Sequence, residues 1–186
     1  FFDALKDLSV SVFAEPRYEA DDLIATLSGQ EPVPYVIVSH DKDLLALVSD
    51  AKQVSAYNPM SDKWTREIDV VEKFGVEPWQ LYDYLGLLGD TVDGIPGVAG
   101  VGAKTAAKLI GRFGTLDALY ANEAAFRAEV TKKQFESLVA NKDNAFLSRM
   151  LACPITCDEI ALTGHGDLWA PESDFVRGAT HMTRRS

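Results

Sequence analysis

The sequence contains few of the residues that zinc sites and disulfides require. Two cysteines and three histidines occur among its 186 residues, and neither Cys153 nor Cys157 has a neighbouring histidine to complete a zinc site. We expect two free thiols in a reducing compartment, which makes the cytoplasm the default location. No apolar run approaches the roughly 20 residues of a membrane span, so no membrane partner is expected.

Basic side chains are also scarce. The chain has 18 Lys and Arg residues against 28 Asp and Glu residues, a net charge of −10, which at first argues against a nucleic-acid partner. The charge is uneven, because residues 1–93 hold 7 basic and 18 acidic side chains whereas residues 94–186 hold 11 and 10. Divalent cations bound in the acidic half would neutralise part of its charge. With 47% hydrophobic residues, the chain can bury a full core.

Two common nucleotide-binding loops are absent. A P-loop needs a glycine, four residues and then Gly-Lys-Thr, but Ala103 separates Gly102 from Lys104. A dinucleotide loop needs G-x-G-x-x-G directly after a strand, whereas Thr105 stands in the place of its last glycine and the preceding run is typical of a helix. The glycine-rich stretch therefore predicts neither kind of nucleotide site.

The most informative stretch runs from residue 85 to residue 113. Asp90 and Asp93 end its apolar first part. A loop at residues 97–102 then opens a helix whose apolar residues follow helical spacing. This pattern predicts a helix-hairpin-helix whose first element ends near Ile95 and Pro96, with an ordinary glycine-capped helix pair as the alternative. Backbone N–H groups at a glycine-rich helix start can bind phosphate.

A second group of acids lies near the start of the chain. Glu19, Asp21 and Asp22 precede an apolar stripe, so we place them in the first turn of a helix. A helix N-terminus stabilises one or two carboxylates, but three within four residues repel one another. A shared cation would offset that repulsion better than the helix end alone.

A third group follows the buried strand predicted at residues 35–38. Asp41 and Asp43 flank Lys42 at the carboxyl end of this strand, where open α/β sheets place their sites. Leu45 stands where phosphatases with a D-x-D nucleophile have a small polar residue, which counts against that chemistry. A capped turn is the alternative for the D-x-D by itself. His40 is assigned to packing or to support of a neighbouring ligand.

The remaining elements are predicted from periodicity and from Gly and Pro. Strands are expected at residues 9–14, 53–57 and 64–66, and a helix is expected at residues 1–9. Further helices are expected at residues 68–76, 78–89, 115–126 and 132–151. Periodicity is lost from residue 164 on.

Three segments in this order, YEADDLIATL, SHDKDLLALV and LLGDTVDGIPGVAGVGAKTAAKLI, resemble the structure-specific 5′-nucleases. These are the 5′-3′ exonuclease domain of bacterial DNA polymerase I, stand-alone bacterial and phage 5′-exonucleases, and flap endonucleases. The resemblance spans roughly residues 1–150. It implies an α/β fold with a PIN-like nuclease core, followed by a helix-hairpin-helix arm. It also implies that phosphodiesters near the 5′ ends of branched or duplex DNA are hydrolysed with two Mg²⁺ or Mn²⁺ ions.

The resemblance carries roles onto matching residues. The implied metal ligands are seven carboxylates: Glu19, Asp21, Asp22, Asp41, Asp43, Asp90 and Asp93. Asp41 and Asp43 are the candidate catalytic pair, together with Lys42, which either balances charge beside the scissile phosphate or is an ordinary solvated lysine. The candidate DNA contacts are Gly97, Gly100, Gly102, Lys104, Thr105 and Lys108. The hairpin loop of the family often holds K⁺ on its carbonyl oxygens.

The predicted division is a nuclease core at residues 1–93, a helix-hairpin-helix region at residues 94–163 and an irregular tail at residues 164–186. The strand and the basic arch that begin the family do not precede Phe1, so the resemblance implies a member without its N-terminal part. An N-terminal segment of the same protein and a DNA polymerase are therefore candidate partners. The competing interpretation is a non-catalytic DNA-structure-binding module, or a fragment that needs such a segment in trans for activity.

Overall fold

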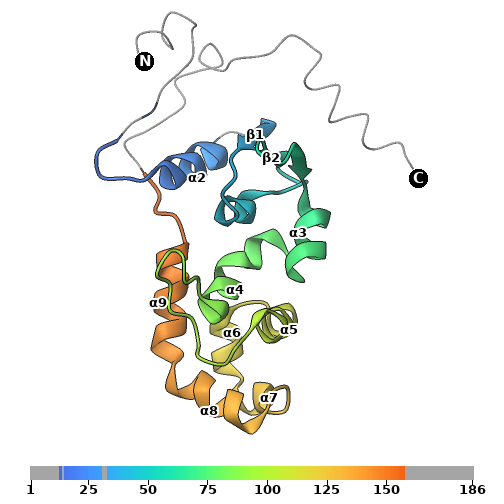
Figure 1. The fold of residues 1–186 in the computed structure, drawn as a ribbon, viewed down its shortest axis with the longest axis vertical. Coiled ribbons are helices and arrows are strands. Elements are labelled where there is room, and N and C mark those ends of the chain that lie inside the picture. The colour runs from blue at the N-terminus through green and yellow to red at the C-terminus, as the bar shows by residue number, and fades with distance from the viewer. Residues whose placement is uncertain (1–12, 14, 31–32, 158–186) are drawn as a thin grey trace, which may run out of the picture.

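The computed structural model describes residue 13, residues 15–30 and residues 33–157. The helix predicted at residues 1–9 and the tail predicted from residue 164 lie outside these residues, as does most of the strand predicted at residues 9–14. Figure 1 shows a small sheet with helix α2 beside it at one end of the molecule and a group of helices at the other.

The sheet-containing end consists of α2 (Ala20–Gln30), β1 (Tyr35–Val38), the 3₁₀ helix η1 (Asp43–Leu47), β2 (Val54–Asn58) and β3 (Lys63–Thr65). β1 pairs in parallel with β2, and β2 pairs antiparallel with β3. The three predicted strands in this part of the chain are confirmed to within one residue. The first turn of α2 carries two of the three acids expected there, Asp21 and Asp22, whereas Glu19 lies just before the helix.

The turn after β1 is tightened by side chains that bond to the backbone. Ser39 Oγ accepts a hydrogen bond from the Asp41 N–H at 3.0 Å, and Asp41 Oδ1 accepts one from the Asp43 N–H at 2.9 Å. Ser and Asp commonly form such turns. The helix predicted to follow is the short η1, which buries Leu44 and Ala46. Its burial anchors the carboxylates at the carboxyl end of β1.

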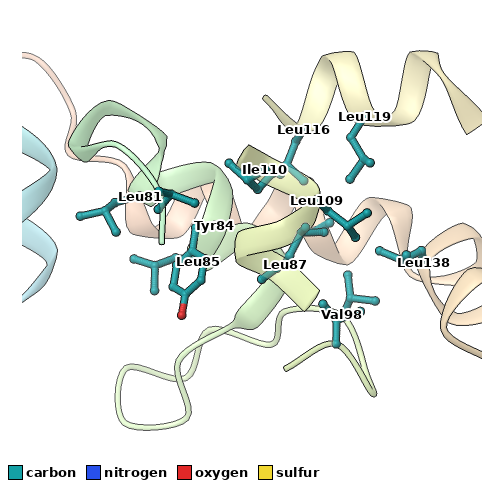
Figure 2. Packing of buried hydrophobic residues seen from close by; sticks show 14 of the residues in the cluster. Leu81, Tyr84, Leu85, Leu87, Val98, Leu109, Ile110, Leu116, Leu119 and Leu138 are labelled. Atoms are coloured by element: carbon teal, nitrogen blue, oxygen red, sulfur yellow. The ribbon is translucent and has the colours of Figure 1, made fainter. Parts of the chain in front are cut away.

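The described part of the chain continues with eight helices: α3 (Glu67–Phe74), the 3₁₀ helix η2 (Pro78–Gln80), α4 (Leu81–Leu88), α5 (Ala103–Phe113), α6 (Leu116–Ala121), α7 (Glu123–Arg127), α8 (Lys132–Ala140) and α9 (Lys142–Ala152). α4 lies at their centre and packs against α5 and α9. Figure 2 shows its Leu87 directed toward Leu109 of α5 and toward Val98, and both leucines are fully buried. Burial of these apolar side chains is the main stabilising contribution in this region.

The connection between α4 and α5 differs from the predicted hairpin. Its first element was expected to end near Ile95 and Pro96, but α4 ends at Leu88. Gly89 follows with a φ of 75°, a left-handed conformation that stops the helix. Asp90 and Ile95 then exchange backbone hydrogen bonds of 2.9 and 2.7 Å. This closed turn carries the acids, and only after it does the loop lead into α5.

The single helix predicted at residues 132–151 is divided in two. Asn141 leaves the helical conformation, with φ −110° and ψ 24°, between α8 and α9. Its side-chain amide donates to the Ser137 carbonyl at 2.9 Å, satisfying one of the carbonyls at the end of α8. The amphipathic pattern continues across this break, which is why periodicity alone did not reveal it.

Two buried polar side chains hold the helices together. Gln80 Nε2 donates to the carbonyls of Ile110 and Gly114, at 3.1 and 3.0 Å, where α5 ends. Asp83 in α4 accepts a hydrogen bond from the Leu116 N–H at 3.2 Å and pairs with Arg149 of α9 at 3.1 Å. Because buried polar groups are costly when unpaired, these contacts favour one arrangement of α4, α5, α6 and α9.

Candidate metal centre and phosphate-binding hairpin

Carboxylates from three segments meet at the carboxyl end of β1. We call the set of Asp21, Asp41, Asp43, Asp90 and Asp93 the acid cluster. Burial is the largest cause of the raised pKa of Asp21, and repulsion by Asp41 is the next. Burial likewise raises the pKa of Asp43 to about 6, with added repulsion from Asp41, Asp93 and Asp90. The three acidic segments predicted from the sequence therefore lie close enough to repel one another.

Asp43 is the member of the cluster whose environment is least satisfied. Its Oδ1 atom is buried and has no hydrogen-bond partner among the residues that the structure describes. Among the described residues, Lys42 is the one charge that lowers the pKa of Asp43, and it does not offset burial and repulsion. A buried carboxylate oxygen without a donor is an unfavourable arrangement that a bound cation would relieve. The residues present therefore fit a divalent metal ion.

Asp90 is stabilised differently, because it pairs with Lys42. The Lys42 ammonium forms an ion pair with Asp90 Oδ2, and the Val92 N–H donates to Asp90 Oδ1 at 2.9 Å. The hydrogen bond from Lys42 is the main cause of the lowered pKa of Asp90. Lys42 is thus not an ordinary solvated lysine. It neutralises one member of the acid cluster from the middle of the D-x-D sequence.

Asp22 lies beside the acid cluster, but its carboxylate accepts hydrogen bonds from backbone N–H groups. Its Oδ2 accepts a hydrogen bond from the Glu19 N–H at 2.9 Å, and its Oδ1 accepts one from the Ile155 N–H at 2.7 Å. The neighbouring Thr26 hydroxyl accepts a hydrogen bond from the Cys157 N–H at 2.9 Å. Asp22 therefore tethers the segment after α9 to α2. Sequence reasoning missed this role because Ile155 and Cys157 lie more than 100 residues after α2.

The seven predicted ligands do not form one preformed site. Among the described residues, no three His, Cys, Asp or Glu side chains converge with the geometry of a metal site. Asp41, Asp93 and Glu19 are exposed, whereas both oxygens of Asp22 are engaged. Like charges at close range repel, which disfavours close convergence of these carboxylates when no cation is bound.

The hairpin loop, residues 97–102, presents the start of α5 to solvent. Gly102 is the N-cap of α5, and no side chain caps this end. Gly102, Ala103 and Lys104 are all exposed. An uncapped and exposed helix N-terminus leaves backbone N–H groups available to an anion. This end of α5 therefore has the features of a phosphate-binding site.

The glycines of the loop divide into two kinds. Gly97 is buried, its N–H donates to Ser148 Oγ at 2.8 Å, and a Cβ on it would lie 2.5 Å from the Gly89 nitrogen. A Cβ on Gly102 or on Gly100 would meet nothing within 4 Å. Gly97 therefore holds the loop against the helices and is not placed for DNA contact. Gly100 and Gly102 leave the loop surface open.

The basic residues of α5 also differ from one another. Lys108 and Arg112 both form ion pairs with Glu129, and Lys108 Nζ lies 2.9 Å from Glu129 Oε2. Lys104 makes no ion pair within the described part of the chain. Thr105 Oγ1 accepts a hydrogen bond from Gln134 Nε2 at 3.2 Å. Of the three basic residues of α5, Lys104 is therefore the one most available to an anion. The sequence could not show this difference, because Lys104 and Lys108 are both predicted on the exposed face of the helix.

Two further expectations concern cysteines and membranes. Cys153 is exposed and Cys157 is buried, and both are free thiols as expected. Within the described residues, no helix is both long enough and apolar enough to cross a membrane.

The sequence matches two consecutive parts of one family. Residues 2–75 match the family described as 5′-3′ exonuclease, N-terminal resolvase-like domain, and residues 76–163 match the one described as 5′-3′ exonuclease, C-terminal SAM fold. The chain belongs to the 5′-3′ exonuclease family. The two matches confirm the predicted order of an α/β nuclease core and a helical region. They meet between α3 and η2, whereas the division predicted after residue 93 stays a prediction.

Similar proteins include enzymes that are much longer than this chain. The chain is 40% identical over 139 residues to a 5′-3′ exonuclease of Aquifex aeolicus (strain VF5), a match covering 73% of the chain and 47% of that protein. It is 44% identical over 152 residues to a DNA polymerase I of Rhizobium leguminosarum, covering 80% of the chain and 14% of the polymerase. The chain thus spans about half of the first relative.

Solved structures with the same fold include a mutant of the T5 5′-exonuclease. Its TM-score is 0.69 at 25% sequence identity, covering 82% of this chain and 64% of the T5 protein. A T5 protein co-crystallised with metal ions matches with a TM-score of 0.67, also at 25% identity, over 81% of this chain and 58% of that one.

Proposed function

We propose that this chain contributes the metal centre and the DNA grip of a 5′-nuclease. The reaction is hydrolysis of phosphodiesters near the 5′ ends of branched or duplex DNA. The observation that carries the proposal is Asp43, whose buried Oδ1 has no partner among the described residues. Its acidic neighbours are Asp41 of the same turn and Asp90 and Asp93 of the segment after α4. Such crowding of acids disfavours the metal-free fold and favours a fold with bound cations.

The acid cluster suits Mg²⁺ or Mn²⁺, because both prefer hard oxygen ligands. When bound, two such ions would supply activation of a water molecule and stabilisation of the leaving oxygen of a phosphodiester. Asp21, Asp41, Asp43, Asp90 and Asp93 would hold the ions, and Glu19 stays a candidate at the exposed rim. Asp22 would support Asp21 by fixing the first turn of α2.

Lys42 would not be a metal ligand. Its ammonium group would offset negative charge at the phosphate. Its side chain is 42% exposed while it pairs with Asp90, so an anionic phosphate drawn to the cluster can reach it. Its pKa is raised, chiefly by the hydrogen bond to Asp90, so it stays protonated throughout the neutral range. A permanent ammonium beside the scissile phosphate would offset the negative charge that develops there.

The hairpin would grip the DNA backbone without reading its sequence. Gly100, Gly102, Lys104 and Thr105 surround the open start of α5, where backbone N–H groups and one ammonium can share a phosphate. Lys108 contributes less, because Glu129 already neutralises it. The K⁺ implied by the resemblance would need carbonyl oxygens of the same loop and stays a prediction.

A DNA polymerase is a proposed covalent partner. Relatives named DNA polymerase I contain the matching segment within a chain of which it forms about one seventh, 14% in the Rhizobium leguminosarum protein. The cytoplasmic location rests on the two free cysteines alone and likewise stays a prediction.

The competing function, a non-catalytic DNA-structure-binding module, has one observation in its favour. The oxygens of Asp22 and Asp90 are already engaged by protein groups, and among the described residues no three acids converge. Such a protein would bind DNA through the hairpin while the acid cluster remained without a catalytic ion.

Calorimetric titration with Mn²⁺ and cleavage of a labelled 5′-flap DNA separate the two functions. A nuclease should bind Mn²⁺ and cut in an EDTA-sensitive way, and Asp43→Asn should weaken Mn²⁺ binding and abolish cutting. Asp50→Asn is the matched control, because Asp50 is exposed and stands at the opposite end of β2. DNA binding without cutting, whether or not Mn²⁺ binds, would favour the binding module. Failure to bind Mn²⁺ would overturn the metal centre.

A further inference from the structure

A polar cleft of about 150 Å³ opens next to the acid cluster. Its walls come from the turn after β1, from both strands of the β2–β3 hairpin and from α3. Asp41 and Lys42 belong to its lining, so the cleft and the acid cluster share one wall. None of the roles proposed above uses the rest of this cleft.

The cleft gathers cations in the acidic half of the chain. Lys42, Lys63 and Lys73 line it, and they are three of the seven basic residues among residues 1–93. Lys63 and Lys73 are exposed, and neither makes an ion pair within the described residues. Lys73 only stacks on the Phe74 ring, at 4.8 Å from its centroid. Two lysines are thus available to a ligand.

The other charged groups of the cleft do not cancel these lysines. Asp69 Oδ2 accepts a hydrogen bond from the Arg66 N–H at 2.8 Å and so caps α3. Asp41 belongs to the acid cluster and accepts a hydrogen bond from the Asp43 N–H. His40, expected to pack or to support a ligand, is exposed and lines the same cleft. It adds a ring N–H donor to the cleft.

We propose that this cleft, here called the lysine cleft, is a subsite for one phosphate group of the nucleic-acid strand. The subsite rests on the proposed nuclease function and adds to it a contact apart from the hairpin. Lysine ammonium groups with neighbouring hydroxyls, here from Ser61 and Thr65, are a typical environment for phosphate oxygens. Sites for whole drug-sized ligands measure about 300–1,000 Å³. The lysine cleft therefore takes a phosphate and part of a sugar, and not a complete nucleotide.

The position of the lysine cleft gives this contact a function. A strand whose phosphate is held by Lys63 and Lys73 has its next phosphates directed along the shared wall toward Asp41 and Asp43. Fixing a second point on the strand orients the scissile bond, and small misplacements of reacting atoms are costly. The bound group is either a terminal 5′-phosphate or an internal phosphodiester, because both present the same oxyanion chemistry.

The test measures binding of the 186-residue chain to a fluorescent 5′-flap DNA by anisotropy, in EDTA so that the strand stays intact. The double variant Lys63→Ala/Lys73→Ala should bind about three- to tenfold more weakly, and its salt slope should fall by about one phosphate contact. The Lys63→Arg/Lys73→Arg variant should retain binding. Lys52→Ala is the matched control, because Lys52 is exposed and lies at the far end of β2.

Each flap is prepared with a 5′-phosphate and with a 5′-hydroxyl. A terminal phosphate in the lysine cleft predicts that the parent prefers the phosphorylated flap and that the double variant loses this preference. An internal phosphate predicts equal losses on both flaps. Equal binding by the parent and the double variant would overturn the lysine cleft and leave the proposed function standing. If the parent binds no DNA even at low salt, the proposed DNA grip and the lysine cleft fall together.

Discussion

The acid cluster, proposed to bind metal ions, and the hairpin loop, proposed to bind a DNA phosphate, differ in how far their polar groups are satisfied by neighbouring residues. In the cluster, Asp43 has a raised pKa and a buried oxygen without a partner among the described residues. Lys42 pairs with Asp90 and offsets only part of the burial and repulsion at Asp43. In the hairpin, Gly97 and Ala99 are anchored by Ser148 and Ser137 of the flanking helices. The cluster thus keeps repulsion that its protein neighbours do not remove, whereas the hairpin loop is held by hydrogen bonds within the described chain.

The largest expected effect is a difference in protein stability between alanine substitutions at Gly97 and at Gly102 of the hairpin loop. Gly97→Ala should lower the free energy of unfolding by roughly 3 kcal/mol or more, because it combines left-handed strain with backbone overlap. Its φ is 60°, and the added Cβ would lie 2.5 Å from the Gly89 nitrogen. Gly102→Ala, at φ −94° and with open space, is the control and should unfold like the parent. Urea unfolding followed by circular dichroism measures both. Equal stability would show that the loop is not preformed.

The next effect tests whether Asp22 is a tether. Asp22→Ala leaves the N–H groups of Glu19 and Ile155 without their acceptor, which should cost about 1–3 kcal/mol. This loss should be as large in EDTA as in Mn²⁺, because the tether contains no metal. Asp93→Ala removes an exposed acid of the cluster and serves as the matched control, with no loss expected in EDTA. An Asp22→Ala loss that appeared only in Mn²⁺ would make Asp22 a ligand.

Removing the negative charge of Asp43 should raise the free energy of unfolding of the metal-free protein, whereas the two substitutions above lower it. The pKa of Asp43 is about 6, above the 3.8 of an unperturbed aspartate, so the folded state binds more protons than the unfolded state between these pH values. Stability of the metal-free parent should therefore fall as pH rises from about 4 to about 6. Asp43→Asn should remove this fall.

After allowance for solvent screening, the Asp43→Asn variant should be more stable than the parent by about 1–2 kcal/mol at pH 7, and equally stable at pH 4. Thermal unfolding in EDTA at the two pH values measures this, with Asp50→Asn as the control. Saturating Mn²⁺ should reverse the order at pH 7. A variant less stable than the parent in EDTA at pH 7 would contradict the repulsion on which the metal centre is based.

The smallest effect concerns single lysines of α5. Lys104→Ala should weaken duplex binding by about threefold and lower the salt slope by about 0.9. Lys108→Ala should change binding less, because Glu129 already neutralises Lys108. Anisotropy titrations at several salt concentrations compare the two variants. A larger effect of Lys108→Ala would show that Glu129 releases its partners when DNA binds.

The sequence predicted secondary structure correctly where the residues that determine it lie within a few positions of one another. The alternation and turn residues around residues 53–66 predicted the β2–β3 hairpin, and the acids before Leu23 predicted the first turn of α2. The first hairpin element was placed wrongly, because a run of apolar residues continues past Gly89 and conceals the closed turn between Asp90 and Ile95. The break at Asn141 was hidden in the same way.

The sequence by itself determined the family, the order of its two parts and the identity of the acids, because these follow from short motifs in a specific order. Only the tertiary structure decided which residues of each motif are engaged by other parts of the protein and which remain available to a ligand. Asp21 and Asp22 are neighbours of the same chemistry, but Asp22 faces the chain after α9. Lys104 and Lys108 are one helical turn apart, but Glu129 stands beside the second. Electrostatic and hydrogen-bond partners are set by distance in space, and residues far apart in the chain supply them.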